Sequence, residues 1–202
     1  MDEIEKTKEY YDKNAQHWNH EKRDPMYARA VFKNFIKYLK TDAYFLDIGC
    51  GVGREIPMFK DAAPQLKFDG LDISQSMLDL ASNINPEVKF YCENIVDPNL
   101  KLETTYDTFW AFGVLQHIPL EHWPTLLSNL RKIIKPGGFG FVALPQERNS
   151  APQDPRHFQL FKPGDLEKLI ELAEWKIIQK GTIGQDIGNT RLWLWYIVRL
   201  PE

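Results

Sequence analysis

Hydrophobic and polar positions follow two different periods along this chain. Short apolar runs of strand length are separated by segments in which apolar residues return every three or four positions, the spacing of one helix face. The apolar runs predict strands at residues 44–48, 88–91, 106–112 and 139–144, and a further strand, the second along the chain, that ends with residues 69–72. Strands that alternate with helices predict an α/β fold with a mostly parallel sheet.

Two of the helical segments between these strands have clear boundaries. Residues 77–84 follow Ser74, a residue type that caps helix N-termini well. Residues 123–134 run into Lys135-Pro136-Gly137-Gly138, where proline and two glycines predict a turn into the next strand. These boundaries favour short connections and one compact unit.

The two ends of the chain add further elements. Residues 166–173 have helical spacing and precede apolar runs at 177–178 and 191–200, which the short segment 184–189 can join as an antiparallel hairpin. Two helical stretches, residues 3–15 and 26–39, precede the first strand. We expect a single domain over residues 1–202, with 1–40 as an N-terminal helical lid or cap within it.

Composition narrows the possible functions. The formal charge is −3, from 25 Lys and Arg against 28 Asp and Glu, so the chain lacks the positive field that general nucleic-acid binding uses. The acidic N-terminus has no signal-peptide core, and the longest apolar run, 192–198, is too short to cross a membrane. Two cysteines are too few for a disulfide framework or a zinc site. We expect a cytoplasmic protein without a bound metal, and its oligomeric state stays open.

The strongest chemical signal is a glycine loop directly after the first strand, Leu46-Asp47-Ile48-Gly49-Cys50-Gly51-Val52-Gly53-Arg54. Ligands of open α/β sheets bind beyond the carboxyl ends of the strands, so this loop predicts a nucleotide-like cofactor. A dinucleotide fold needs glycine where Arg54 stands. Asp47 would also repel a pyrophosphate at the helix N-terminus, whereas it would attract a cationic group such as a methionine ammonium.

A second candidate is Asp72, at the end of the second strand. A carboxylate there can accept hydrogen bonds from both hydroxyls of a ribose. The alternative is that Asp72 caps the next helix, but Ser74 can supply that cap.

With these segments in order, the chain resembles the class I S-adenosyl-L-methionine-dependent methyltransferases, in particular the branch that acts on small molecules. The resemblance also covers Val114-Leu115-Gln116-His117 after the fourth strand and Lys135-Pro136-Gly137-Gly138. It implies a Rossmann-like sheet of seven strands in the order 3-2-1-4-5-7-6, with strand 7 antiparallel and helices on both faces. It also implies S-adenosyl-L-methionine as cofactor and S-adenosyl-L-homocysteine as product.

The resemblance implies further contacts to that cofactor. Glu93 or Asn94 would hold the adenine amine, with Ile95 beside it, and the aromatic N-terminal segment would cover the cofactor with Tyr11 and Trp18. An aromatic face can stabilise a sulfonium by cation-π attraction, although both residues can equally pack the helix onto the domain. The full predicted set of cofactor-binding residues is Tyr11, Trp18, Asp47, Gly49, Cys50, Gly51, Gly53, Asp72, Ile73, Met77, Glu93, Asn94, Ile95, Phe112 and Leu115.

His117 is the predicted catalytic residue. Methyl transfer needs mainly the correct position of the acceptor and the exclusion of water, and a general base helps when the acceptor carries a proton. His117 has the right residue type for a base, but it can instead shape the cofactor pocket. His17, His20 and His157 are weaker alternatives.

The acceptor is expected to be a small molecule. The segment 145–162 can line its cavity through a basic and aromatic set, Arg148, Arg156, His157, Phe158 and Phe161, with solvated surface charge as the alternative for the two arginines. No adenine-amine methylase signature and no Pro-Cys nucleophile occur in the sequence. An RNA or protein acceptor stays open, as does a cofactor-binding partner subunit without its own turnover.

Overall fold

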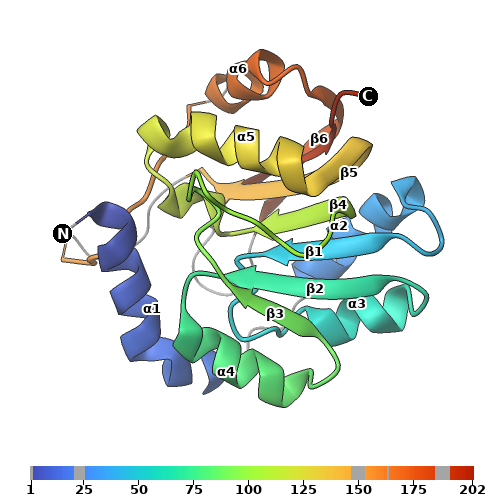
Figure 1. Cartoon of the computed structure of the whole chain (residues 1–202). Coiled ribbons are helices and arrows are strands. Elements are labelled where there is room, and N and C mark those ends of the chain that lie inside the picture. The colour runs from blue at the N-terminus through green and yellow to red at the C-terminus, as the bar shows by residue number, and fades with distance from the viewer. Residues whose placement is uncertain (1, 21–25, 147–152, 163, 185–191) are drawn as a thin grey trace.

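The computed structural model describes residues 2–20, 26–146, 153–162, 164–184 and 192–202 (Figure 1). The strands of this part of the chain form one sheet in the order β3-β2-β1-β4-β5-β7-β6, and β7 is antiparallel to both of its neighbours. The predicted strand order is therefore confirmed. The strands are β1 (Tyr44–Ile48), β2 (Lys67–Asp72), β3 (Lys89–Cys92), β4 (Tyr106–Phe112), β5 (Ile134–Pro145), β6 (Lys176–Gly184) and β7 (Leu192–Arg199).

Helices connect or cover these strands. The α-helices of the described chain are α1 (Glu3–His20), α2 (Met26–Phe35), α3 (Ile56–Ala62), α4 (Gln75–Ile84), α5 (Trp123–Ile133) and α6 (Asp165–Leu172). Short 3-10 helices follow α2 and β4 and precede α5: η1 (Ile36–Tyr38), η2 (Leu115–His117) and η3 (Leu120–His122). The helix expected over residues 26–39 therefore changes to 3-10 geometry after Phe35.

The bounds of the fifth and sixth strands were predicted wrongly. The sixth was expected at residues 177–178, but β6 extends over Lys176–Gly184. The fifth strand was expected to begin at residue 139, but β5 begins at Ile134, which pairs with Tyr106. A shift of register between Tyr106 and Thr108 lets β5 continue through Gly137, whose φ is 69°. The predicted antiparallel arrangement of the last two strands is confirmed, while residues 185–191 of their connection, with Arg191, lie outside the described residues.

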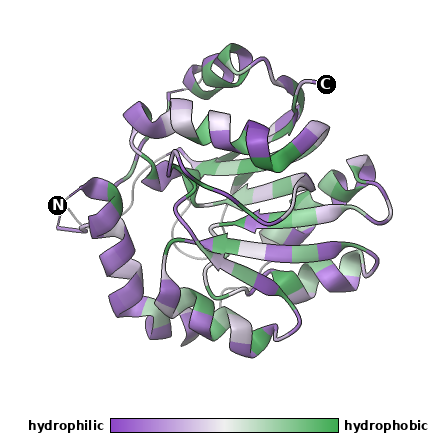
Figure 2. Cartoon of the chain, in the orientation of Figure 1, coloured by the Kyte–Doolittle hydropathy of each residue, from purple (hydrophilic) through white to green (hydrophobic). Residues whose placement is uncertain are grey.

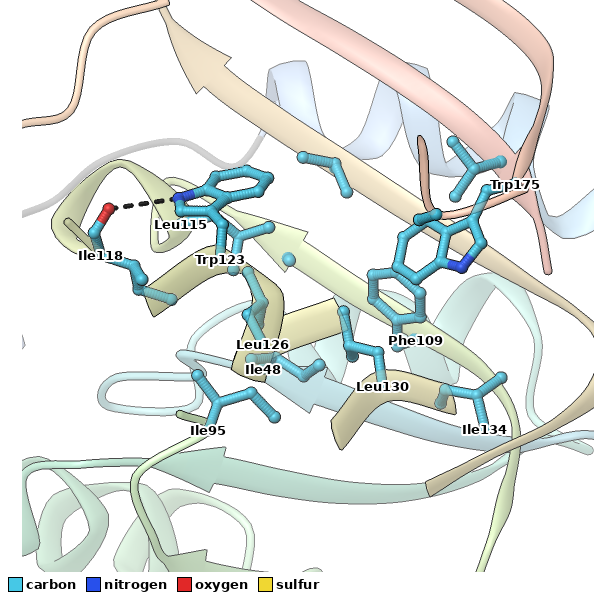
Figure 3. Close-up of a cluster of buried hydrophobic side chains, with 14 of the residues drawn as sticks. Ile48, Ile95, Phe109, Leu115, Ile118, Trp123, Leu126, Leu130, Ile134 and Trp175 are labelled. Carbon is cyan, nitrogen blue, oxygen red and sulfur yellow. Dashed lines mark hydrogen bonds between the residues drawn. The ribbon is translucent and has the colours of Figure 1, made fainter. Parts of the chain in front are cut away.

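Both faces of the sheet are buried, as expected when helices cover a parallel sheet on two sides. Leu46 and Ile48 of β1 face a cluster that contains α5 and α6 residues, whereas Phe45 faces a second cluster with α2 and α3. Figure 3 shows part of the first cluster, in which the Trp123 indole nitrogen donates a hydrogen bond to the carbonyl of Ile118. The sheet is thus packed between two layers of helices.

The expected lid over residues 1–40 separates into two parts with different positions. The following α2 side chains belong to the buried core on the sheet face opposite α5 and α6: Ala28, Val31, Phe32 and Phe35. By contrast, α1 runs along the edge to which the arrowheads of β1, β2 and β4 point (Figure 1). Figure 2 shows α1 as largely hydrophilic. Of these two helices, α1 is therefore the one that lies at the carboxyl ends of the strands.

Hydrogen bonds dock α1 onto the N-terminus of α4. The Ser74 hydroxyl accepts from the Met77 N–H at 3.2 Å and donates to Asp12 of α1 at 2.6 Å. The Ser76 N–H also donates to Asp12. A carboxylate at a helix N-terminus is stabilised by the helix dipole, so Asp12 and the predicted Ser74 cap hold α1 beside the carboxyl end of β2.

Candidate functional site

A pocket lies at the carboxyl ends of β1, β2 and β4, under α1. Its empty volume is about 1190 Å³, a figure that includes space open to solvent. Of the predicted residues, the following line it: Tyr11, Trp18, Asp47, Gly49, Cys50, Gly51, Asp72, Ile73, Met77, Glu93, Asn94, Ile95, Phe112 and His117.

Gly53 and Leu115 were predicted in this set and do not line the pocket. A Cβ on Gly53 would lie 2.8 Å from the Asn85 side chain and 3.1 Å from Ala81. Gly53 is therefore required for packing against α4. Leu115 is buried in the core because η2 turns its side chain toward the α5 layer.

The first two loop glycines have different tasks. Both adopt the left-handed conformation, with φ of 69° at Gly49 and 53° at Gly51, which costs a residue with a Cβ about 1–2 kcal/mol. A Cβ on Gly49 would lie 2.3 Å from Val114, so Gly49 permits close packing of β1 against the β4 end. A Cβ on Gly51 would meet no atom within 4 Å, although Gly51 lines the pocket. Its backbone is therefore open to a ligand.

Several carboxylates face the pocket beside this loop. Asp47 is 4% exposed, and Glu55, Asp72 and Glu93 also line the pocket. Burial, followed by repulsion from Glu55 and Asp72, raises the pKa of Asp47 well above its usual range. A cationic group placed among these carboxylates would relieve that repulsion, whereas a pyrophosphate would increase it.

Asp72 closes the glycine loop against the second strand. One carboxylate oxygen accepts from the Gly51 N–H at 2.9 Å, and the other accepts from the Ser74 N–H at 2.9 Å. Burial raises the pKa of Asp72 above its usual value despite these two hydrogen bonds. Each carboxylate oxygen has further lone pairs, so Asp72 can still accept hydrogen bonds from a diol in the pocket.

One face of α1 forms the roof of the pocket. Ile4, Thr7, Tyr11 and Trp18 all line it. The spacing of these residues is three, four and seven positions, which places them on the same side of a helix. Sequence reasoning selected the two aromatic residues and missed Ile4 and Thr7, although this spacing was a sufficient signal. The other pocket residues not predicted are Ile48, Val52, Arg54, Glu55, Leu71, Trp110, Gly113, Val114 and Ile118.

Hydrogen bonds fix both ring nitrogens of His117. Nδ1 lies 2.7 Å from the carbonyl oxygen of His157 and must donate to it, because a carbonyl only accepts. Nε2 therefore carries the lone pair and accepts from the Tyr11 hydroxyl at 2.9 Å and from Gln116 at 3.2 Å. Burial lowers the pKa of His117 to about 4, and repulsion from Arg156 acts in the same direction. His117 is thus neutral at physiological pH.

The weaker histidine candidates have other contacts. The Nδ1 atom of His157 lies 2.6 Å from Glu3 of α1, and His17 is exposed with its ring against Trp18. Nothing is described for the His20 side chain. Neither His17 nor His157 is among the residues that line the pocket.

Arg156 differs from both of its predicted roles. Its side chain is only 13% exposed, so it is not a solvated surface charge, and it does not line the pocket. Nε and Nη2 bind the two oxygens of Asp154, at 3.0 and 2.6 Å. Phe158 packs against His117, and Phe161 packs against Trp123 in the core, so neither lines the pocket. Arg148 lies outside the described residues.

Two negative findings apply to the described ranges alone. No group of three or more His, Cys, Asp or Glu side chains there is arranged to hold a metal ion. Within the same ranges, no helix combines the length and apolar character needed to cross a membrane.

Comparisons with known proteins agree with the fold. The family model described as methyltransferase domain matches residues 46–139. The tRNA N(3)-methylcytidine methyltransferase of Schizosaccharomyces pombe is 33% identical over 75% of this chain and 72% of that protein. A crystal structure of a SAM-dependent methyltransferase from Anabaena variabilis superposes with a TM-score of 0.79 at 16% identity, covering 99% of this chain and 96% of that one.

Other relatives differ in how much of their length this chain spans. The tRNA (carboxymethyluridine(34)-5-O)-methyltransferase of S. pombe is 24% identical over 89% of this chain and 94% of that protein. The trans-aconitate 2-methyltransferase of Deinococcus radiodurans is 31% identical over 54% of this chain, which spans only 40% of that protein. Relatives with both RNA and small-molecule names therefore match this chain.

We predict that Gly51→Ala folds but loses the predicted cofactor. The added methyl group would stand in the open space of the pocket, so affinity for S-adenosylhomocysteine should fall at least ten-fold in calorimetry, while stability falls by about 1–2 kcal/mol. Gly164→Ala is the matched control, because Gly164 has a φ of 90° and open space around it, and lies outside the pocket lining. Equal affinity losses in both variants would contradict the assignment of Gly51.

Replacing Asp47 by Asn should stabilise the ligand-free protein and weaken ligand binding. A carboxyl whose pKa is raised by folding loses stabilising free energy as pH rises from its unfolded pKa through its folded pKa. Asp47→Asn should therefore raise the Tm at pH 8, with a gain that shrinks toward pH 4. Affinity for S-adenosylhomocysteine should fall about ten- to a hundred-fold, since hydrogen bonds to charged groups contribute about 1.5–3 kcal/mol.

Asp107→Asn is the control for the predicted combination of a higher Tm and weaker ligand binding. Asp107 lies outside the pocket and accepts hydrogen bonds from the Tyr44 N–H and from Lys135, both at 2.9 Å. Its replacement should lower the Tm and leave affinity unchanged. A lower Tm at pH 8 for Asp47→Asn would show that Asp47 is not under electrostatic strain.

Proposed function

Because the chain belongs to the class I S-adenosylmethionine-dependent methyltransferases, we propose that it transfers the methyl group of that cofactor to a small-molecule acceptor. The observation that carries this proposal is the roof of the pocket. Tyr11 of α1 is hydrogen-bonded to the buried His117, so α1 closes over the place where strands β1 and β4 end. A pocket covered in this way suits a small acceptor and limits the access of water to the reaction.

The residues of this pocket fit the cofactor. Asp47 supplies the negative charge that a methionine ammonium requires, and the open backbone at Gly51 allows the ligand to approach the loop. Asp72 is positioned to accept hydrogen bonds from a ribose. When bound, the cofactor supplies an electrophilic methyl group on a sulfonium sulfur, and the protein has to orient the acceptor toward it.

The opposite end of the pocket suits the adenine. Glu93 and Asn94 follow β3, and both line the pocket beside Ile95. The backbone of Ile95 is fixed in position, because the buried Asn129 of α5 donates a hydrogen bond to its carbonyl at 2.8 Å. We assign the adenine amine to this pair of polar side chains, with Ile73 and Ile95 against the ring.

The sulfonium end lies under the aromatic residues of α1. Tyr11 and Trp18 have ring centroids 5.7 Å apart, and Ala15 between them on this face is buried against Val52 and Met77. Aromatic faces attract cations by about 0.5–2 kcal/mol. In this proposal Tyr11 and Trp18 stabilise the positive sulfur and keep the lid closed, and Met77, Phe112 and Cys50 complete the apolar wall.

A tRNA acceptor is the second candidate. The likeness to the S. pombe tRNA (carboxymethyluridine(34)-5-O)-methyltransferase spans nearly all of both chains, which favours it. Against it, the chain carries a formal charge of −3, whereas tRNA binding draws most of its free energy from positive side chains at phosphates.

The deciding experiment offers the pure protein methyl-labelled S-adenosylmethionine together with a small-metabolite extract or, separately, with total tRNA. The proposal predicts label in the small-molecule fraction, and Asp72→Ala, with a weakened ribose contact, should reduce it at limiting cofactor. Label in tRNA would replace the acceptor and keep the reaction. Cofactor binding without label in any fraction, protein included, would favour a partner subunit without turnover.

The proposed role of His117 as general base has a specific pH signature. A base must be unprotonated, and with a pKa of about 4 His117 is unprotonated throughout the neutral range. Because its Nε2 lone pair accepts from the Tyr11 hydroxyl, this hydroxyl would pass its hydrogen to Nε2 and take the acceptor's proton in exchange. The rate should therefore be flat from pH 6 to 8 and fall only as the pH drops through about 5 to 4. His117→Gln should lower turnover by about a hundred-fold if His117 is the base. An inflection near pH 6.5 that disappears in His117→Gln would contradict the buried, neutral state.

A further inference from the structure

Residues 153–162, which we call the strap, contact α1 and η2 through a group of polar interactions. The His157 N–H donates to the hydroxyl of Thr7 at 3.0 Å, and the His157 ring contacts Glu3. The Gln159 N–H donates to the carbonyl of Gln116 at 2.6 Å. The strap is thus fastened both to the lid helix and to the segment that carries His117.

Arg156 is the charged centre of this contact. Its guanidinium lies over the rings of Tyr10, Tyr11 and Trp18 of α1, at 4.6, 5.6 and 5.6 Å from their centroids, and over Phe158 of the strap at 5.2 Å. Asp154, whose side chain is 9% exposed, holds two of its nitrogens in a bidentate pair. The third nitrogen, Nη1, is left to reach the Tyr11 hydroxyl at 3.3 Å.

The hydrogen bonds from Arg156 onward have a single direction. A guanidinium has no acceptor, so Arg156 must donate to the Tyr11 oxygen, and the hydroxyl hydrogen remains for His117 Nε2. His117 in turn donates from Nδ1 to the carbonyl of His157, the strap residue next to Arg156. This series of hydrogen bonds therefore begins at Arg156 and ends at His157, both on the strap. Between them it passes through Tyr11 of α1 and His117 of η2.

We propose that Arg156 is a positioning residue, which through this directed chain holds the Tyr11 hydroxyl toward His117 and the Tyr11 ring over the cofactor pocket. The inference rests on the proposed function, since Tyr11 is the cofactor-covering residue. Lysine at this position would keep a positive charge but lose the planar fork that binds Asp154 while a third nitrogen reaches Tyr11.

The first test is the tautomer of His117 in the unmodified protein. Nitrogen NMR of the ligand-free protein at pH 7 should show His117 with its proton on Nδ1 and an unprotonated, hydrogen-bonded Nε2. Arg156→Lys should shift the Nε2 resonance toward that of a ring without the Tyr11 hydrogen bond. A proton on Nε2 in the unmodified protein would overturn the proposal without any variant being needed.

The second test is a double-mutant cycle on affinity for S-adenosylhomocysteine, measured by calorimetry. Arg156→Lys and Tyr11→Phe should each weaken binding about ten-fold. The double variant should bind no more weakly than Tyr11→Phe, because Arg156 acts through the Tyr11 hydroxyl. Losses that multiply to about a hundred-fold, or normal binding by Arg156→Lys, would show that Arg156 does not act through Tyr11.

Two control variants match these changes. Arg199 pairs with Glu202 and lies over the Phe139 ring at 5.9 Å, away from the pocket, so Arg199→Lys should leave binding unchanged. Tyr10→Phe keeps the ring beneath Arg156 and should also bind normally. If the unmodified protein fails to bind S-adenosylhomocysteine, the proposed function falls. If it binds and the cycle is additive, only the positioning role falls.

Discussion

The organisation of the site depends on negative charge gathered at the ends of two neighbouring strands. Asp47 in β1 pairs with Gly70 in β2, so the parallel register brings the end of β2, with Asp72, beside the glycine loop. Burial raises the pKa of both carboxyls, and repulsion from Glu55 and Asp72 raises the pKa of Asp47 further. The fold tolerates this cost because the surrounding sheet is packed on both faces, and a cationic ligand would remove it.

The position of α1 over the pocket also needs a physical explanation, since Figure 2 shows this helix as largely hydrophilic. Polar contacts at two points hold it in place. Asp12 docks on the N-terminus of α4, and Thr7 and Tyr11 meet the strap and His117. Hydrogen bonds of this kind contribute about 0.5–1.5 kcal/mol each, so together they can fix the position of α1 over the pocket.

Much of the sheet could be predicted because each strand and helix carries its own periodicity, and the glycine loop marks where the first crossover begins. Asp47, Asp72 and His117 all line the pocket. The two aspartates were indicated by their positions at strand ends, whereas His117 was indicated by its residue type and by the family resemblance. The misses arise from packing over long sequence separation. Gly53 is needed because a side chain there would collide with Asn85, which is distant in the sequence. The hydrogen bond from Arg156 to Tyr11 requires the strap to contact α1, and no local sequence pattern indicates that contact.

The most direct test of this account is the proton balance of ligand binding. The ammonium group of S-adenosylhomocysteine should lower the raised pKa of Asp47 when it enters the pocket, so binding should release protons into solution. Calorimetry in two buffers of different ionisation enthalpy, repeated between pH 5 and 8, measures this release. The account predicts release that is lost in Asp47→Asn. Binding with no proton release at any pH in this range, or the same release in Asp47→Asn, would contradict it.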